Sequence, residues 1–274
     1  MKYRNKLRHF LQTTFFILIF LTAISKSAAD SGIVIPLISK ASLHVLCPFG
    51  AVVSFYKLAT TGTFVSKIHE SAMVIFSATV FLSILFGPVF CSWICPLGTL
   101  QELTSRIGKK LRTFGKIKVP PVLDKTLSYV RYGVLIWVLY ITMRSGQLLF
   151  TDYDPYYALF NFWSGEVALS AILILVSTLA LALFVERSWC RYACPFGALL
   201  GLFNKIRIVK LKRKSLTCIT CNACNTQCPM DIEVSAQSTI ADLRCISCFK
   251  CTSEQHCPIP DTVTLQLGGE KNAN

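Results

Sequence analysis

Charged residues are scarce in this chain. Asp, Glu, Lys and Arg together make up 15% of its 274 residues, whereas hydrophobic residues make up 53%. Soluble globular domains are about a quarter charged. The composition therefore excludes an ordinary soluble domain and is typical of a membrane protein.

Glycine-rich phosphate-binding motifs are also missing. The sequence contains neither a G-x-G-x-x-G fingerprint nor a G-x-x-x-x-G-K-[S/T] loop. These motifs bring backbone N–H groups against the phosphates of nucleotides. We therefore expect no NADH or ATP site on this chain.

Acidic residues are few, and the basic residues that outnumber them are unevenly distributed. The formal net charge is +14, but residues 1–9, 104–131 and 187–217 hold four, eight and eight Lys or Arg, whereas 26–70 and 144–166 hold five together. Alternation of this kind is the positive-inside pattern of membrane proteins rather than a nucleic-acid-binding surface. It predicts a multi-pass protein of the cell inner (cytoplasmic) membrane, with both termini in the cytoplasm and membrane lipid, not nucleic acid, as a partner.

Four apolar runs approach the ~20 residues that a bilayer core requires. They are residues 10–25, 71–90, 129–150 and 167–185. The third contains Arg131 and Arg144, which we expect to extend toward opposite membrane interfaces. These runs predict an all-α bundle of four transmembrane helices.

The first apolar run and the segment that follows it have alternative interpretations. Residues 1–30 also fit a secretory signal peptide with a small-residue cleavage site, although the charge pattern favours a retained helix. Residues 33–56 would place Lys40 near the middle of a fifth span, at a cost of ~3 kcal/mol. We therefore interpret 33–56 as a re-entrant or interfacial segment on the outer face.

Eight of the thirteen cysteines lie between residues 218 and 258, in two runs that each read Cys-x-x-Cys-x-x-Cys and end in Cys-Pro. In two-cluster ferredoxins, the three cysteines at this spacing provide three ligands to one [4Fe–4S] cluster. The last cysteine of the same run ligates the other cluster. The spacing predicts two clusters in crossed pairing. The first takes Cys218, Cys221, Cys224 and Cys257, and the second takes Cys245, Cys248, Cys251 and Cys228.

Zinc sites and disulfides are the alternatives for these eight cysteines. Structural zinc sites usually show two separated Cys-x-x-Cys hooks rather than three consecutive cysteines. Disulfides are rare in the reducing cytoplasm. The second run has five residues before its last cysteine where the first run has three, so Cys257 departs from the pattern and has His256 beside it.

An internal repeat carries four more cysteines. Cys91 and Cys95 lie in a Cys-x-x-x-Cys-Pro motif after the second apolar run, and Cys190 and Cys194 lie in the same motif 99 residues later. The spacing places each pair on one face of a helix, at a helix end because proline follows. The repeat predicts a duplicated helix pair and a possible additional redox or metal site, holding iron or forming a reversible dithiol. Cys47 lies in a partial copy of the motif.

The loop between the third and fourth runs contains Asp154 followed by Pro155. This pair predicts an N-cap and the first residue of a helix, and the aromatic residues around it are typical of an interfacial belt. A quinone-headgroup pocket is a compatible interpretation. Its proton-accepting candidates are Asp152, His44, His69 and Glu70.

Taken together, the two Cys-x-x-x-Cys-Pro motifs, the Asp-Pro-Tyr-Tyr loop and the two cysteine runs resemble the NapH/MauN family of membrane iron–sulfur proteins, related to NosR and CcoG. The resemblance covers nearly the whole chain. It implies electron transfer between the quinol pool and a redox partner, which could be an iron–sulfur protein, a cytochrome or an oxidoreductase. Related members imply two alternatives, an assembly or maturation factor that reduces a metal or thiol, and a redox sensor.

The predicted organisation has four parts: a transmembrane domain over 1–204, a basic linker over 205–214, an α+β bacterial-ferredoxin-like domain over 215–262, and a disordered tail over 263–274. We expect the linker to lie on anionic lipid headgroups. The predicted function is that of an electron-transfer component of a quinol-dehydrogenase-like system. Its cofactors are two [4Fe–4S] clusters and quinol.

Overall fold

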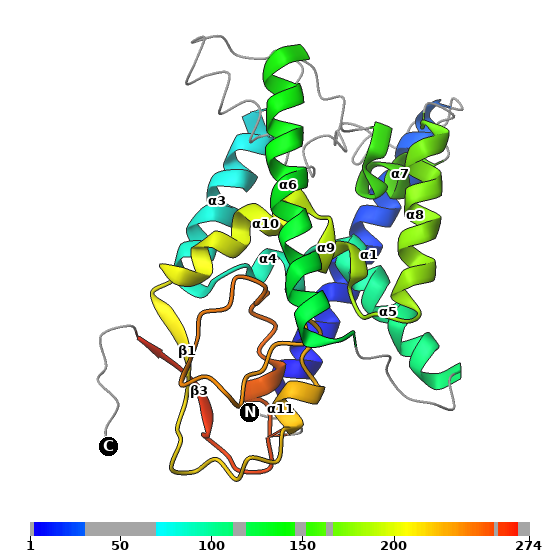
Figure 1. The fold of residues 1–274 in the computed structure, drawn as a ribbon. Helices are drawn as coiled ribbons and strands as arrows, with labels where there is room; N and C mark the ends of the chain where they lie inside the picture. The colour runs from blue at the N-terminus through cyan, green and yellow to red at the C-terminus, as the bar shows by residue number, and fades with distance from the viewer. Residues whose placement is uncertain are drawn as a thin grey trace.

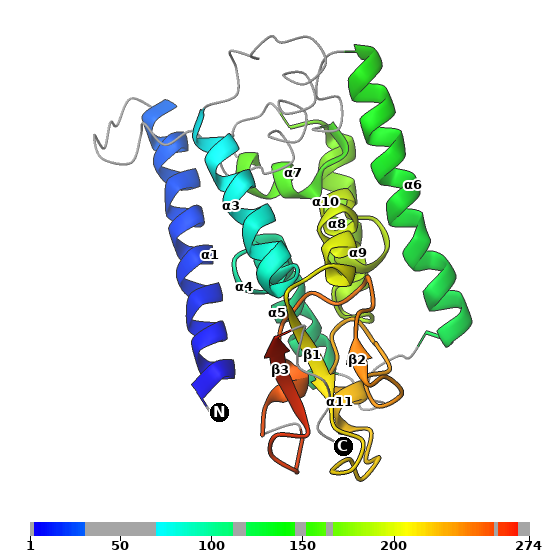
Figure 2. The same ribbon diagram turned by 90° about the vertical axis from the view of Figure 1, so that its left-hand side faces the viewer.

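Four helices that cover the predicted apolar runs, here called the long helices, form the bundle of the helical domain. The computed structural model describes residues 3–30, 70–111, 119–145, 152–162, 167–254 and 257–267. The long helices are α1 (Tyr3–Asp30), α3 (Glu70–Phe86), α6 (Pro121–Ser145) and α8 (Leu169–Ala182). The cysteine-rich segment lies at one end of this bundle (Figure 1, Figure 2).

Consecutive long helices run in opposite directions. The first turns of α1 and α6, the last residue of α3 and the turn that follows α8 all lie against the cysteine-rich segment. The hydrogen bonds and ion pairs at these ends join Asn5 to Ser253, Asp124 to Arg244, Phe86 to Ser247 and Glu186 to Lys250. The start of the chain and the cysteine-rich segment therefore lie at the same end of the bundle.

By length and composition, α6 is the one described helix that could cross a membrane, over Val122–Arg144. Shorter apolar helices cover Val74–Phe86 and Leu169–Ala182. The predicted span over 71–90 is interrupted because Gly87 takes a left-handed conformation (φ 84°) and Pro88 follows it. Four membrane crossings stay a prediction.

Arg131 of α6 is buried, with 2% of its surface exposed. Its Nη2 donates to the Tyr132 hydroxyl at 3.0 Å, and it lies close to Gly201. Arg144, in contrast, is exposed near the end of α6, over the ring of Tyr140. Arg131 therefore lies inside the protein, on the face of α6 that packs against α10, and the extension of the two arginines toward opposite membrane interfaces stays a prediction.

The predicted duplication is visible in the helices. In the first half, α4 (Val89–Trp93) is followed by α5 (Pro96–Leu111), and in the second half α9 (Ser188–Tyr192) is followed by α10 (Pro195–Leu202). Each second helix begins at proline, whose fixed φ suits the first helical position. The outer helix α1 packs against α4 and α5, and α6 packs against α9 and α10.

The two halves interlock. The α5 helix of the first half packs against α8 of the second, with Gly108 so close that an added Cβ would overlap the Leu183 backbone. Conversely, the Ile208 N–H donates to the Ile84 carbonyl at 2.9 Å. Ile84 and Leu183 occupy the same position in the two halves, so each long helix ends against the other half.

The cysteine-rich segment is built on a small antiparallel sheet with strand order β2-β1-β3. The strands are β1 (Val209–Arg213), β2 (Thr239–Ile240) and β3 (Val263–Leu267). At its centre, buried Leu211 pairs with Ile240 and Leu265. Short helices α11 (Ala223–Thr226) and η4 (Lys250–Thr252) complete the segment.

Two sheet strands occupy regions that the sequence assigns otherwise. The predicted basic linker over 205–214 contains β1, the central strand, because Val209 and Leu211 alternate with lysines at the period of a strand. The predicted disordered tail begins with β3, in which Val263 and Leu265 alternate with polar residues in the same way. Strands β1 and β3 therefore belong to the folded cysteine-rich domain.

Candidate iron–sulfur sites

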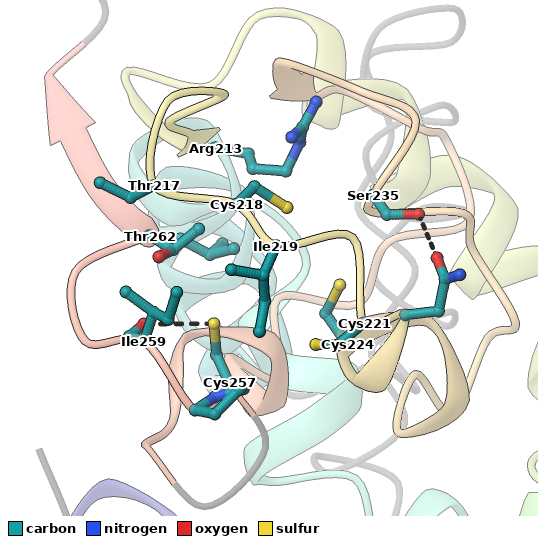
Figure 3. Close-up of a pocket in the computed structure, with 13 residues that line it drawn as sticks. Arg213, Thr217, Cys218, Ile219, Cys221, Cys224, Ser235, Cys257, Ile259 and Thr262 are labelled. Carbon is teal, nitrogen blue, oxygen red and sulfur yellow. Dashed lines mark hydrogen bonds between the residues drawn. The ribbon is translucent and has the colours of Figure 1, made fainter.

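The first cysteine site lies at the far end of the cysteine-rich domain. Figure 3 shows four sulfur atoms facing a common space beside Ile219. They belong to Cys218, Cys221, Cys224 and Cys257. Cys221 is exposed, so this site lies close to solvent.

The second cysteine site lies between the first site and the helices. Its cavity is lined by Cys228, Cys245, Cys248 and Cys251 together with apolar side chains such as Met230 and Ile232. Each run therefore sends its last cysteine to the cavity of the other run. The two sites are neighbours, because α11, which carries Cys224 of the first site, packs against η4, which carries Cys251 of the second.

The two cysteine runs share one backbone design. Residues with left-handed φ flank the middle cysteine of each run, namely Thr220 and Asn222 in the first and Ser247 and Phe249 in the second. This conformation is uncommon for residues other than glycine. It turns the three consecutive thiols of each run toward one cavity.

The donor atoms of both cavities fit an iron–sulfur cluster, which is held by four cysteine thiolates. Burial raises the pKa of the Cys228 thiol to about 12, and the nearby Cys248 adds to the shift. A buried thiol in such surroundings becomes a thiolate when the positive charge of a metal offsets its burial. His256, which directly precedes Cys257 in sequence, lies outside the described residues.

The second site is docked tightly onto the helical domain. The Ser247 hydroxyl donates to the Phe86 carbonyl at 2.8 Å, and Trp93 Nε1 donates to the Ser247 carbonyl at 3.2 Å. Trp93 and Phe249 also form an edge-to-face ring contact at 6.2 Å. An added Cβ on Gly87 would overlap the Ser247 hydroxyl, so only glycine fits this approach.

A buried carboxylate network holds the same interface. Glu102 of α5 pairs with Arg187 and with Lys250, both at 3.0 Å, and also with Arg8. Burial alone would raise the pKa of Glu102, but Arg187, Arg8 and Lys250 hold it well below its usual range. Because Lys250 directly precedes Cys251, the network fixes the second site against α1 and α5.

Glu186 extends this network. It accepts from Lys109 at 2.7 Å and from Lys250 at 3.4 Å. Burial opposes ionisation, yet Lys250 and Lys109 lower the pKa of Glu186. No spacing rule in the sequence identifies these partners, since Lys250 lies far along the chain from both glutamates.

Asp124 of α6 forms a second anchor. Its carboxylate accepts from Arg244 at 2.6 Å and from the Tyr192 hydroxyl at 2.7 Å, and it also pairs with Arg191. Asp124, Arg191 and Arg244 line a cleft of about 790 Å³ between the start of α6 and the cysteine-rich domain. The anchor joins the second half of the helical domain to that domain.

Of the four candidate proton acceptors of the quinone pocket, Asp152 is the one whose side chain lies in the described part of the chain. Asp152 is exposed, and the side chain of Glu70 at the start of α3 lies outside the described part. His44, Cys47 and His69 also lie outside it. Asp154 caps α7 (Pro155–Asn161) by accepting from the Tyr156 N–H at 3.0 Å, so the predicted N-cap is confirmed. Burial raises the pKa of Asp154 to about 6.

The repeated motifs place their cysteines differently from the prediction. Cys91 and Cys190 lie within the short helices α4 and α9, whereas Cys95 and Cys194 directly precede the prolines that begin α5 and α10. Each pair therefore spans a break between two helices instead of one helical face. The proline after the second cysteine causes this break.

All twelve cysteines in the described part of the chain are free thiols. Over the same residues, no group of three or more Cys, His, Asp or Glu side chains closes on a single metal ion. Two cavities with four thiols each define an iron–sulfur protein of the ferredoxin type.

Comparison with known proteins supports this class. A family described as a 4Fe-4S binding domain matches residues 68–114 and 167–215, and each matched segment contains one Cys-x-x-x-Cys-Pro motif. The chain belongs to the NapH/MauN-type family of ferredoxin-type proteins. No solved structure matches it.

Three relatives illustrate the similarity. The putative electron transport protein YccM of Escherichia coli is 34% identical over 73% of this chain and 57% of its own length. The uncharacterized protein MJ0750 of Methanocaldococcus jannaschii is 35% identical over 76% of this chain and 82% of its own length. The ferredoxin-type protein NapH of Haemophilus influenzae is 26% identical over 71% and 69%. The chain thus spans little more than half of the E. coli relative.

Proposed function

We propose that this protein relays electrons between the membrane quinol pool and a redox partner through two [4Fe–4S] clusters. The observation that carries the proposal is the series of two adjacent four-thiol cavities. One lies near solvent and the other against the helical bundle.

The first cluster would be held by Cys218, Cys221, Cys224 and Cys257, and the second by Cys228, Cys245, Cys248 and Cys251. Each cluster, when bound, supplies reversible one-electron chemistry. The chain itself sets the surroundings. Apolar side chains such as Met230, Ile232 and Ile240 exclude water from the second site, whereas the exposed Cys221 leaves the first site accessible to a partner.

The positions of the two sites support an order in which electrons pass through them. The second site is bound to the helical domain through Ser247 and Lys250, so electrons that arrive from a membrane donor meet it first. The first site would then exchange electrons with a redox protein in the cytoplasm. Quinol as the donor follows from the family resemblance and from the membrane composition of the chain.

The test is anaerobic purification followed by iron and acid-labile sulfide counts and by EPR after quinol addition. Replacing Cys224 and Cys248 together with serine should remove about eight iron and about eight sulfide, because each change breaks one four-iron cluster. Reduction of the clusters by quinol in wild-type membranes should produce EPR signals that this variant lacks.

Three outcomes would separate the alternatives. Stoichiometric zinc without acid-labile sulfide would show that the eight cysteines hold zinc instead of iron–sulfur clusters. Clusters that form but are not reduced by quinol would contradict the proposed transfer of electrons between quinol and the clusters. Turnover that depends on an added metal or thiol substrate would favour the maturation role.

A further inference from the structure

Strand β1 passes both cysteine sites and is flanked by two arginines. Leu211, at the centre of the strand, lines the second cavity, and Arg213, its last residue, lines the first. Arg207 lies two residues before the strand, on the side of the second site. The strand and the residues before it therefore bring one positive charge to each site.

The contacts of Arg207 are with the wall of the second cavity. Its Nη1 donates to the Ser247 hydroxyl at 3.4 Å, and its Nη2 donates to the Ile240 carbonyl. Ile240 lines this cavity, and Ser247 directly precedes Cys248. Burial raises the pKa of the Cys245 thiol, and the positive charge of Arg207 acts against this rise. The guanidinium group therefore lies directly behind the thiols of the second site.

Arg207 is also enclosed by protein. Only 1% of its surface is exposed, and its Nε has no hydrogen-bond partner. The ion pairs of the described residues do not include it. Asp242, two residues after Ile240, pairs instead with Arg244 at 2.9 Å and faces Arg131. A charge in the protein interior acts more strongly on its neighbours than a charge in water does, so Arg207 acts strongly on the second site.

This charge matters because the two sites differ in burial. The second cavity is lined by apolar side chains, whereas the first includes the exposed Cys221. Reduction adds one electron, and therefore one negative charge, to a cluster that four thiolates already make anionic. Buried surroundings disfavour added charge, and solvent exposure and nearby charge both set cluster potentials. Burial alone would therefore make the second cluster the harder of the two to reduce.

We propose that Arg207 raises the reduction potential of the second cluster and so offsets the effect of its burial. Arg213 acts in the same way on the first cluster. Its effect is smaller, because Arg213 is partly exposed and water screens its charge. The inference rests on the two clusters of the proposed function and does not depend on quinol as the donor.

The experiment is a dithionite titration of the full-length protein, purified anaerobically and followed by EPR. In Arg207→Gln, the ratio of reduced to oxidised second cluster at a fixed potential should fall roughly tenfold, which corresponds to about 59 mV for one electron. Arg207→Lys keeps the positive charge and should titrate close to the wild type. Arg213→Gln should move the other reduction step, and by less.

The matched control is Lys205→Gln. It removes the same charge from the same segment, but Lys205 is exposed, so both reduction steps should stay in place. Iron and acid-labile sulfide are counted in every protein, and we expect about eight of each. These counts report that the clusters are present whatever their potentials.

The outcomes separate this inference from the proposed function. A wild type without iron and sulfide would overturn both. With about eight of each, an Arg207→Gln protein that titrates like the wild type would overturn the role of Arg207 alone. An equal shift in Lys205→Gln or in Arg207→Lys would do the same.

Arg207→Met covers the case in which Arg207→Gln does not hold the second cluster, because methionine fills the site without a polar end to bury. Loss of this cluster from both neutral variants, with retention in Arg207→Lys, would support a requirement for the positive charge. Loss from Arg207→Lys as well would overturn the proposal and make Arg207 a structural residue.

Discussion

At the residue scale, one lysine connects the cysteine chemistry to the helical scaffold. Lys250 lies between Phe249 and Cys251 in sequence, and its ammonium group reaches both Glu102 and Glu186. Removing one member of a buried ionic network leaves its partners uncompensated. Within this network, Glu102 pairs with more basic side chains than Glu186 does.

We expect Glu102→Gln to destabilise the protein by about 3–5 kcal/mol, the range for breaking a buried ion pair. Anaerobic thermal unfolding measures the effect. The matched control is Glu233→Gln, because Glu233 is exposed, and it should unfold like the wild type. Equal unfolding temperatures for all three proteins would contradict a structural role for the network.

The pH dependence of this difference has a defined sign. The folded-state pKa of Glu102 lies well below its ordinary value of 4.5. Its contribution to stability is therefore present above pH 4.5 and is lost as the pH falls through the folded-state pKa. The stability gap between wild type and Glu102→Gln should be constant from neutral pH to about pH 5 and should narrow at lower pH.

Each run contributes its last cysteine to the cavity of the other run, and this crossed pairing gives a second prediction at this scale. Cys228→Ser should produce the same EPR change as Cys245→Ser, because both thiols line the second cavity. Cys257→Ser should instead match Cys218→Ser, which lines the first. Matching spectra for Cys228→Ser and Cys218→Ser would show that each run ligates its own cluster.

At the element scale, the turn between α3 and α4 is one place where the cysteine-rich domain closely approaches the helices. Gly87→Ala should destabilise the protein, because alanine is strained at φ 84° and its Cβ would overlap the Ser247 hydroxyl. Gly133→Ala is the control. Gly133 lies within α6 with open space around it, so alanine should be neutral or stabilise by up to about 1 kcal/mol.

The measurement is limited proteolysis together with anaerobic unfolding of both glycine variants. Faster cleavage in the cysteine-rich domain of Gly87→Ala alone would show that this contact holds the domain in place. Equal protection of both variants would mean that the domain is held by the ion pairs instead.

The elements differ in how well the sequence predicts them. The duplicated motifs and the Asp154 cap follow from local rules, because proline and short polar side chains act on their immediate neighbours. Strand β1 does not, since three basic residues in five obscure the alternation of Val209 and Leu211. The pairing of Glu102 with Lys250 is a product of tertiary packing, which no local pattern encodes.

At the scale of the whole molecule, the alternating helices place the start of the chain and the cysteine-rich domain at one end. Cysteine labelling or reporter fusions should place residues 116 and 274 in the cytoplasm and a site near Asp154 outside. The reason is the biased distribution of Lys and Arg along the chain. An external carboxyl terminus would contradict the topology and would put the cysteine-rich domain in an oxidising compartment.

The interlocking of the two halves has a consequence for ancestry. Because α3 ends against the second half and α8 against the first, a protein made of one half would have no partner for the end of its long helix. It would also possess one of the two Cys-x-x-x-Cys-Pro motifs. Two copies of such a half-length protein, facing each other across a twofold axis, would restore both features. The present chain is therefore organised as a symmetric dimer whose subunits have been joined into one polypeptide.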